Sequence, residues 1–355
     1  MNPVRVTFLR TVRKLRSQLS TAFAVWAFLA ASAVLFAFGL ERADGASISV
    51  AVVWAAALSP VLPALAALLA MDVWSEERQT GRVDLLLTVA VRERDYVLGK
   101  FLGVLAHLLV AVALSLAASL CLLWRYAPSA FADASLGDFM LASAVLVVQG
   151  ALWCAVSVAA SSVFCHASAA AVVSAMLTVA LPRGLWAAMM AWSGARREAL
   201  GEMPLDAHVV DFASGLMSTG VLASYAVLTC AFLFLAVMAV SSYRLVGRGA
   251  RVHRLSAAVA VALSFVFAVM AILLAVRMDM KVDLPMAGSS AAFSPRTRKV
   301  LAEAGGDLTV TCFLPRNDAR FRPAARFLRQ LRREAESVGA SHVSVRFVDP
   351  RWDKF

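Results

Sequence analysis

The sequence contains few charged residues and lacks the short motifs that mark several common enzyme classes. Only 16% of its 355 residues are charged, whereas soluble domains average about a quarter. No phosphate-binding loop of the G-x-x-x-x-G-K type followed by Ser or Thr occurs, and HExxH and GxSxG are absent too, so nothing indicates an ATPase, a metalloprotease or an esterase. The five cysteines form no CxxC pair, which argues against disulfides and a metal centre. We expect a chain that is not an enzyme and binds no cofactor itself.

Long apolar runs fill most of the sequence instead. Hydrophobic residues make up 61% of the chain and the mean hydropathy is +0.76, which predicts a mainly α-helical membrane protein, since a span needs about 20 apolar residues. Seven runs have the required character: 21–40, 47–71, 101–124, 139–164, 167–192, 220–241 and 256–276. Arg183 interrupts the fifth run, so we expect it at the outer membrane interface, with 184–192 as a re-entrant or surface helix.

Basic residues are distributed unevenly between alternate loops. The N-terminal segment, the 72–100 loop and the 242–255 loop carry fourteen Lys and Arg residues, against four in the other short loops. The positive-inside rule then places the N-terminus in the cytoplasm and, after seven spans, residues 277–355 outside. We expect a multi-pass protein of the bacterial inner (plasma) membrane. The net charge of +11 is therefore not a sign of nucleic-acid binding.

Residues 1–19 form an amphipathic pattern. Apolar residues recur at helical spacing, with basic residues at the positions between them; the apolar positions are Val4, Phe8, Val12, Leu15 and Leu19. The pattern predicts an interfacial helix that prefers anionic lipid. A basic arm that only sets topology, or a brace for a cytoplasmic partner, remains an alternative.

The internal loop 72–100 mixes charges of both signs. Six acidic and five basic residues lie there, although a loop that only sets topology needs Lys and Arg alone. Gly81 breaks the segment, and Asp84 then begins a short helix with a small Leu ridge. Such a surface suits docking on another protein. A solvated amphipathic connector is the alternative.

Three stretches of this loop carry a family resemblance. Residues 76–81 (EERQTG), 84–87 (DLLL) and 96–101 (YVLGKF) resemble the internal loop of ABC-2 type transporter permeases, of the GldF- or NosY-like kind. Arg82 and Ala90 depart from that pattern, in which Thr and Pro are common. A second stretch, His208 to Met217, is similar to the segment before the sixth span of the same family.

The resemblance implies a six-span permease over residues 20–245. Its loop 72–100 would dock on a separate ABC ATP-binding subunit, which holds ATP and Mg, and the permease would pair with itself or with a second permease subunit. The residues implied in coupling to the ATPase are Glu76, Glu77, Gly81, Asp84, Leu85, Leu86, Gly99 and Lys100.

The tail after the seventh span, 256–276, has a different pattern. Helix signals at 295–304 and 322–338 alternate with strand signals at 308–314 and 343–348, which predicts a parallel βαβ unit within an extracytoplasmic domain, 277–355. Two strands make a poor domain alone. We therefore expect either that the chain is truncated after Phe355 or that another subunit completes the sheet.

Three stretches of this tail, 293–301 (FSPRTRKVL), 310–313 (VTCF) and 343–350 (VSVRFVDP), resemble the start of GldG-type auxiliary domains of ABC transporters. The resemblance implies a further GldG-type component as a partner. An arginine-rich face could contact lipid headgroups or an acidic polymer, or could be simply solvated; its residues are Arg322, Arg326, Arg329 and Arg333. The function expected is the permease subunit of an ABC-2 type exporter with an unidentified substrate. The rival interpretation is a non-transport scaffold or anchor of a gliding-motility or envelope complex.

Overall fold

A computed structural model describes the chain in several stretches. The described residues are 3–43, 49–81, 92–128, 131, 136–180, 208–209, 212–213, 216–242, 250–277, 281–283, 308–313, 324, 327–328, 331 and 343–348. The chain divides into two compact units, Met1–Ala287 and Gly288–Phe355, and each is described by itself.

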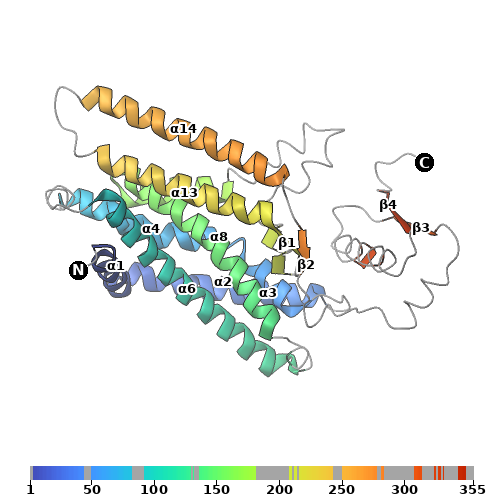
Figure 1. Cartoon of the computed structure of the whole chain (residues 1–355). Helices are drawn as coiled ribbons and strands as arrows, with labels where there is room; N and C mark the ends of the chain where they lie inside the picture. The colour runs from blue at the N-terminus through green and yellow to red at the C-terminus, as the bar shows by residue number, and fades with distance from the viewer. Residues whose placement is uncertain are drawn as a thin grey trace. The chain divides into compact units, whose positions relative to one another are not determined.

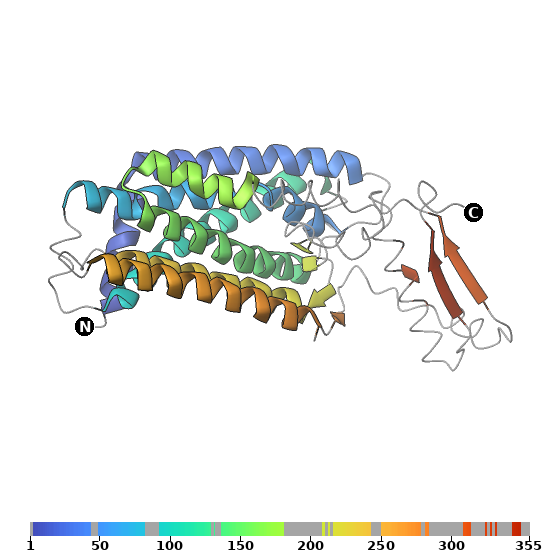
Figure 2. The same ribbon diagram turned by 90° about the horizontal axis from the view of Figure 1, so that it is seen from above.

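The first unit is a bundle of helices (Figure 1). Its helices are α1 (Pro3–Ser17), α2 (Leu19–Ala43), α3 (Val50–Leu58), α4 (Leu62–Gln79), α6 (Glu93–Tyr126), α8 (Leu136–Val163), α9 (Ala167–Ala175), the π-helical turn η1 (Met176–Ala180), α13 (Thr219–Ser241) and α14 (Ala250–Arg277). The long helices run lengthwise, and α1 lies across one end of them (Figure 2). That end is named the α1 end of the bundle below.

Four of the described helices are long and apolar enough to cross a membrane. They are α2, α6, α8 and α13, and they confirm the runs predicted at 21–40, 101–124, 139–164 and 220–241. A fifth span results if α3 and α4 act together, although they are bent by 43°. The runs at 167–192 and 256–276 coincide with shorter apolar helices, Ala167–Val179 and Ser256–Ile272, so six spans and a seventh remain predictions. Arg183 and 184–192 lie outside the described residues.

The predicted run 47–71 is broken into α3 and α4. Pro60 lies in the break and Pro63 in the first turn of α4. A proline lacks the N–H that a continuous helix needs and is accepted in a first helical turn. Gln149 of α8 donates a hydrogen bond from Nε2 to Ser59 Oγ at 2.9 Å. A buried side chain of the neighbouring helix therefore contacts the bend directly.

Apolar packing and a few polar contacts hold the helices together. Trp54 of α3 meets Phe139 of α8 edge to face, with ring centroids 5.9 Å apart. Hydroxyl groups link α2 to α6 through Ser32 and Ser115, with the two oxygens 3.1 Å apart. Such interhelical hydrogen bonds in apolar surroundings contribute about 0.6–2 kcal/mol each.

Helices α13 and α14 run antiparallel. Phe232 and Phe265 pack edge to face between them, 5.2 Å apart. Strand β1 (Leu216–Ser218), which precedes α13, pairs antiparallel with β2 (Lys281–Asp283), which follows α14. The chain after α14 therefore returns to the end of the unit at which α13 begins.

The second unit contains the parallel strand pair that the sequence predicted. Strand β3 (Leu308–Cys312) pairs with β4 (Val343–Phe347) in parallel, with Leu308 opposite Val343. The helix predicted between them at 322–338 is described only at four helical positions, so the βαβ unit remains a prediction. The predicted helix 295–304 and the four arginines of the arginine-rich face lie outside the described residues.

Helix α1 packs on α6 through small residues. A Cβ built on Gly99 would lie 2.6 Å from Thr7 Cβ and 2.9 Å from the Val4 carbonyl oxygen. One turn further along, a Cβ on Gly103 would lie 2.7 Å from Thr11 Cβ. Glycines spaced by four residues thus let α1 approach α6 closely, in the manner of small-residue contacts between membrane helices.

This contact buries one side of α1 against α6. The buried residues of α1 are Thr7, Thr11 and Leu15, of which Leu15 belongs to the apolar set of the sequence pattern. The two glycines accept the small Thr side chains, and the interfacial role of residues 1–19 stays a prediction.

We predict that Gly99→Leu detaches α1 from α6. The new side chain has no room beside Thr7, and overpacking of this kind costs about 1–3 kcal/mol. Limited trypsin digestion of the purified chain should then cut within the arginine-rich α1 several times faster. Ala113→Leu, at an exposed position of the same helix, is the matched control; equal digestion of both variants would contradict the packing role.

Candidate functional site

The last turn of α4 is the place where helices of the bundle meet through charged side chains. Residues 76–79 (EERQ) are named the EERQ segment below. Gly81 follows with φ +66°, a left-handed conformation that glycine adopts without strain. The helix thus ends where the sequence predicted a break, and Gly81 redirects the chain towards residues 82–91.

Glu77 forms a buried ion pair with Lys100 of α6. The Lys100 ammonium donates to Glu77 Oε2 and to the Val73 carbonyl oxygen at 2.6 Å, and its side chain is only 2% exposed. It also lies 3.7 Å from the centre of the Trp74 ring. Tyr96 donates from its hydroxyl to the same Glu77 oxygen at 2.9 Å. Carbonyl, carboxylate and ring together solvate the buried cation, as a desolvated charge requires.

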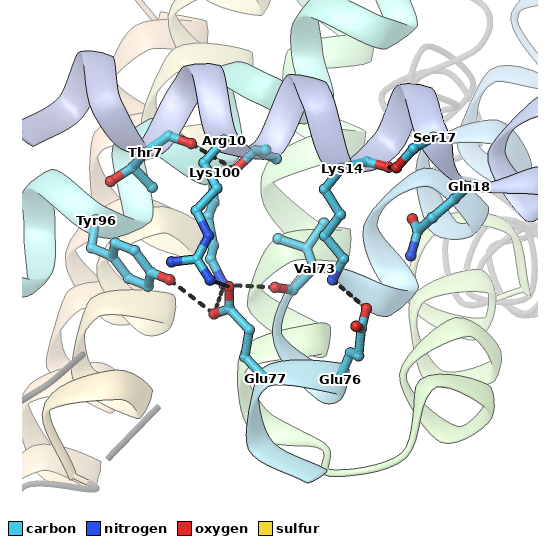
Figure 3. Close-up of a pocket in the computed structure, with 11 residues that line it drawn as sticks. Thr7, Arg10, Lys14, Ser17, Gln18, Val73, Glu76, Glu77, Tyr96 and Lys100 are labelled. Carbon is cyan, nitrogen blue, oxygen red and sulfur yellow. Dashed lines mark hydrogen bonds and ion pairs between the residues drawn. The ribbon is translucent and has the colours of Figure 1, made fainter. Parts of the chain in front are cut away.

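Helix α1 supplies two further cations to this cluster. Lys14 Nζ lies 2.6 Å from Glu76 Oε2 and donates to the Asp72 carbonyl oxygen at 2.8 Å. A nitrogen of the Arg10 guanidinium lies 4.0 Å from Glu77 Oε1. Figure 3 shows Arg10, Tyr96 and Lys100 converging on Glu77 while Lys14 reaches Glu76. The two glutamates therefore join α4 to both α1 and α6.

The other side of the EERQ segment joins α8. Arg78 donates to the carbonyl oxygen of Val163, the last residue of α8, at 2.8 Å. Gln79 donates to the Cys165 carbonyl oxygen at 3.1 Å. The final carbonyls of a helix have no partner within it, and a cation placed there is favourable. Arg78 therefore caps α8 from the neighbouring helix.

One turn earlier, a serine links the same two helices. Ser161 Oγ of α8 accepts a hydrogen bond from the Trp74 backbone N–H at 3.2 Å and donates to the Met71 carbonyl oxygen at 3.2 Å. Three neighbouring helices thus hold the last two turns of α4.

The structure brings together some of the predicted coupling residues and separates others. Glu77 and Lys100 meet as a pair, while Glu76 lies beside them and is half-exposed. Gly99 turns away from this pair, towards α1. Asp84, Leu85 and Leu86 lie outside the described residues. The last turns of α4 and the first turns of α6 therefore form an internal junction, and the described exposed residues of the loop are 79–81, 92, 94 and 98.

Four residues of the junction were missed in the sequence. Arg10 and Lys14 were interpreted as basic residues of an interfacial helix or of a topology-setting arm. Their contacts with α4 were missed because pairing across more than 60 positions leaves no local pattern. Tyr96 carried a usable signal: it precedes Lys100 by four positions and therefore shares its helix face. Trp74 was placed in the loop 72–100 and given no role.

We predict that replacing one partner of the buried ion pair destabilises the fold far more than replacing both partners. Lys100→Met leaves the Glu77 carboxylate buried without its main partner and should cost about 3–5 kcal/mol. The double variant Glu77→Leu/Lys100→Met should recover most of that loss, since a buried pair replaced by apolar residues is often neutral. Thermal unfolding of the detergent-solubilised chain measures both.

Arg94→Met provides the control for this comparison. It removes an exposed ion pair with Asp95, 3.6 Å long, from the same helix, and should cost at most about 1 kcal/mol. The account would be contradicted if the double variant lost as much stability as Glu77→Leu alone and Lys100→Met alone added together.

Comparison with known proteins supports the resemblance found in the sequence. A family model described as ABC-2 family transporter protein matches residues 13–194, just over half of the chain and including Lys14, the EERQ segment and Lys100. The tail lies outside this match, so its GldG-like character remains a prediction. No curated protein matches the chain. Together with the apolar helices, the match shows that this chain is a multi-pass membrane protein that belongs to the ABC-2 transporter family.

Proposed function

We propose that the chain is the permease subunit of an ABC exporter and draws its energy from a separate ATP-binding subunit. Membership of the ABC-2 family supports this function. These 355 residues contain no phosphate-binding loop, which supports a separate ATP-binding subunit. The observation that carries the proposal is the convergence of α1, α6 and α8 on the EERQ segment.

The contact with the ATPase falls on the exposed residues beyond this junction. Glu77 and Lys100 are buried, so they transmit a displacement and do not touch the partner. Gln79, Thr80 and Gly81 are exposed and lead directly into residues 82–91. In the proposed orientation this surface faces the cytoplasm, where ATP is available.

A displacement of this loop by the ATPase is transmitted to several helices at once. The ion pairs of Glu76 and Glu77 carry it to α1 and α6, and the Arg78 hydrogen bond carries it to the end of α8. Tightly packed elements of this kind move as bodies, in steps of about 1–2 Å.

In this proposal α4 tilts about the bend that joins it to α3. Helix α4 has 18 residues, which makes it about 27 Å long. A tilt of about 5° at the bend would move its EERQ end by about 2 Å, a displacement of the size seen in helix shifts. Gln149, bonded to Ser59, holds the bend against α8 while α4 tilts.

The proposal is tested by expressing the chain together with candidate ABC ATP-binding subunits from the same genome. A permease should form a stable complex with one of them and raise or gate its ATP hydrolysis. A scaffold or anchor would leave the hydrolysis rate of every candidate unchanged, and that result would sink the proposal.

We predict that Gly81→Ala weakens this coupling while the bundle stays folded. A Cβ at Gly81 meets no other atom, yet the left-handed backbone costs an alanine about 1–2 kcal/mol. The residues that follow should therefore leave α4 in another direction, and stimulated ATP hydrolysis should fall several-fold.

Gly81→Asn is the matched variant, because asparagine tolerates the left-handed conformation. It should retain most of the stimulation. Equal activity in the alanine and asparagine variants would show that the direction of the chain at Gly81 does not matter for coupling.

A further inference from the structure

A cavity of about 310 Å³ lies beneath α1, between that helix and the ends of α4 and α6. It is named the α1 cavity below. Three cations line it, Arg10, Lys14 and Lys100, together with the two carboxylates Glu76 and Glu77. Figure 3 shows these side chains directed into the space between the helices.

The charges that line the cavity do not cancel. Glu77 is neutralised by Lys100, and Glu76 lies against Lys14 at 2.6 Å. Arg10 is left over: its nearest carboxylate is 4.0 Å away and its side chain is 51% exposed. The α1 cavity therefore holds one surplus positive charge at its mouth.

The two cations on the α1 side of the cavity, Arg10 and Lys14, lie one turn apart on that helix, as expected for one helix face. Gln18, which lies in the break between α1 and α2, lines the same space. A guanidinium fork and an ammonium beside it suit the oxygens of a phosphate group, and an amide adds a neutral donor. These donors therefore suit an anionic group such as a phosphate ester.

The surroundings select an amphiphile in preference to a free anion. Directly after Gln18, α2 begins with an apolar stripe on one face, Leu19, Phe23 and Trp26, each of which is more than 70% exposed. Acyl chains can lie along this stripe while the headgroup enters the cavity. Anionic lipids also concentrate beside basic segments at a membrane surface.

We propose that the α1 cavity binds the phosphate headgroup of an anionic membrane lipid through Arg10 and Lys14. The bound headgroup competes with Glu76 for the Lys14 ammonium, so occupancy changes one of the contacts that join α4 to α1. This binding goes beyond the proposed function and does not depend on it, because it needs no ATPase and is measured without one.

The test is a titration of the purified full-length chain with phosphatidylglycerol and with phosphatidylcholine, followed by native mass spectrometry. Phosphatidylglycerol should bind about tenfold more tightly than phosphatidylcholine. Each basic contact near a membrane surface changes affinity by about fivefold, so Arg10→Gln/Lys14→Gln should weaken phosphatidylglycerol binding by about tenfold or more.

Two further variants separate the cavity from general basicity and from misfolding. Arg5→Gln/Arg13→Gln removes the same charge from exposed positions of α1 and should weaken binding less than about twofold, since neither residue lines the cavity. Glu76→Gln removes the competing carboxylate and should tighten binding severalfold, a gain that an unfolded protein cannot give.

Three results would overturn the proposal. One is equal weakening by the two double variants, which would indicate diffuse attraction to α1. Another is a Glu76→Gln variant that binds no more tightly than the original chain. The third is displacement of phosphatidylglycerol by millimolar glycerol phosphate, which would assign the cavity to a soluble phosphate compound.

Discussion

The buried ion pair between Glu77 and Lys100 is the constraint on which the α1 end of the bundle depends. It fixes the last turn of α4 to the second turn of α6, so the chain between 80 and 92 starts and finishes on one rigid base. Desolvating two charges is expensive unless their remaining hydrogen bonds are satisfied. The Val73 carbonyl, the Tyr96 hydroxyl and the Trp74 ring meet that requirement, which explains why so many polar and aromatic groups gather at one helix end.

From this pair the contacts extend in two directions. Towards α1, the Lys14–Glu76 ion pair and the glycine contacts of α6 hold a basic helix across the bundle. Towards α8, Arg78 binds the terminal carbonyl of a helix that also reaches the bend near Ser59. Mechanical coupling from an ATPase and binding of an anionic lipid would therefore act on the same few side chains, because Lys14 belongs to both the α1 cavity and the α4 junction.

Hydropathy predicted the helices well, because apolar length depends only on neighbouring residues in the sequence. Hydropathy alone missed the features that depend on proline or on contacts between two helices. The run 47–71 looked continuous, yet Pro60 and Pro63 bend it; both prolines were a local signal that could have been used. The apolar residues of α1 were predicted to face lipid, and the packing of Thr7 against Gly99 was not predicted. That packing depends on the partner helix and is invisible in α1 alone.

The candidate site was predictable in outline and not in detail. Acids within an apolar chain drew attention to residues 76 and 77, whose role in coupling stays a prediction, and the break predicted at Gly81 follows the end of α4 at Gln79. The partners Arg10 and Lys14 were not predictable, since ion pairing across distant segments leaves no periodic trace. Exposure was missed for the same reason: Glu77 and Lys100 looked like surface residues until the packing of α4 against α6 buried them.

The most direct test of the central claim is a distance between spin labels at Arg13 of α1 and Thr80 at the end of α4, in a complex with an ATPase that turns over ATP. If the ion pairs join α1 and α4 into one moving body, the distance distribution should be the same with and without ATP. A shift of about 2 Å, the displacement expected for a tilt of α4 alone, would contradict the account.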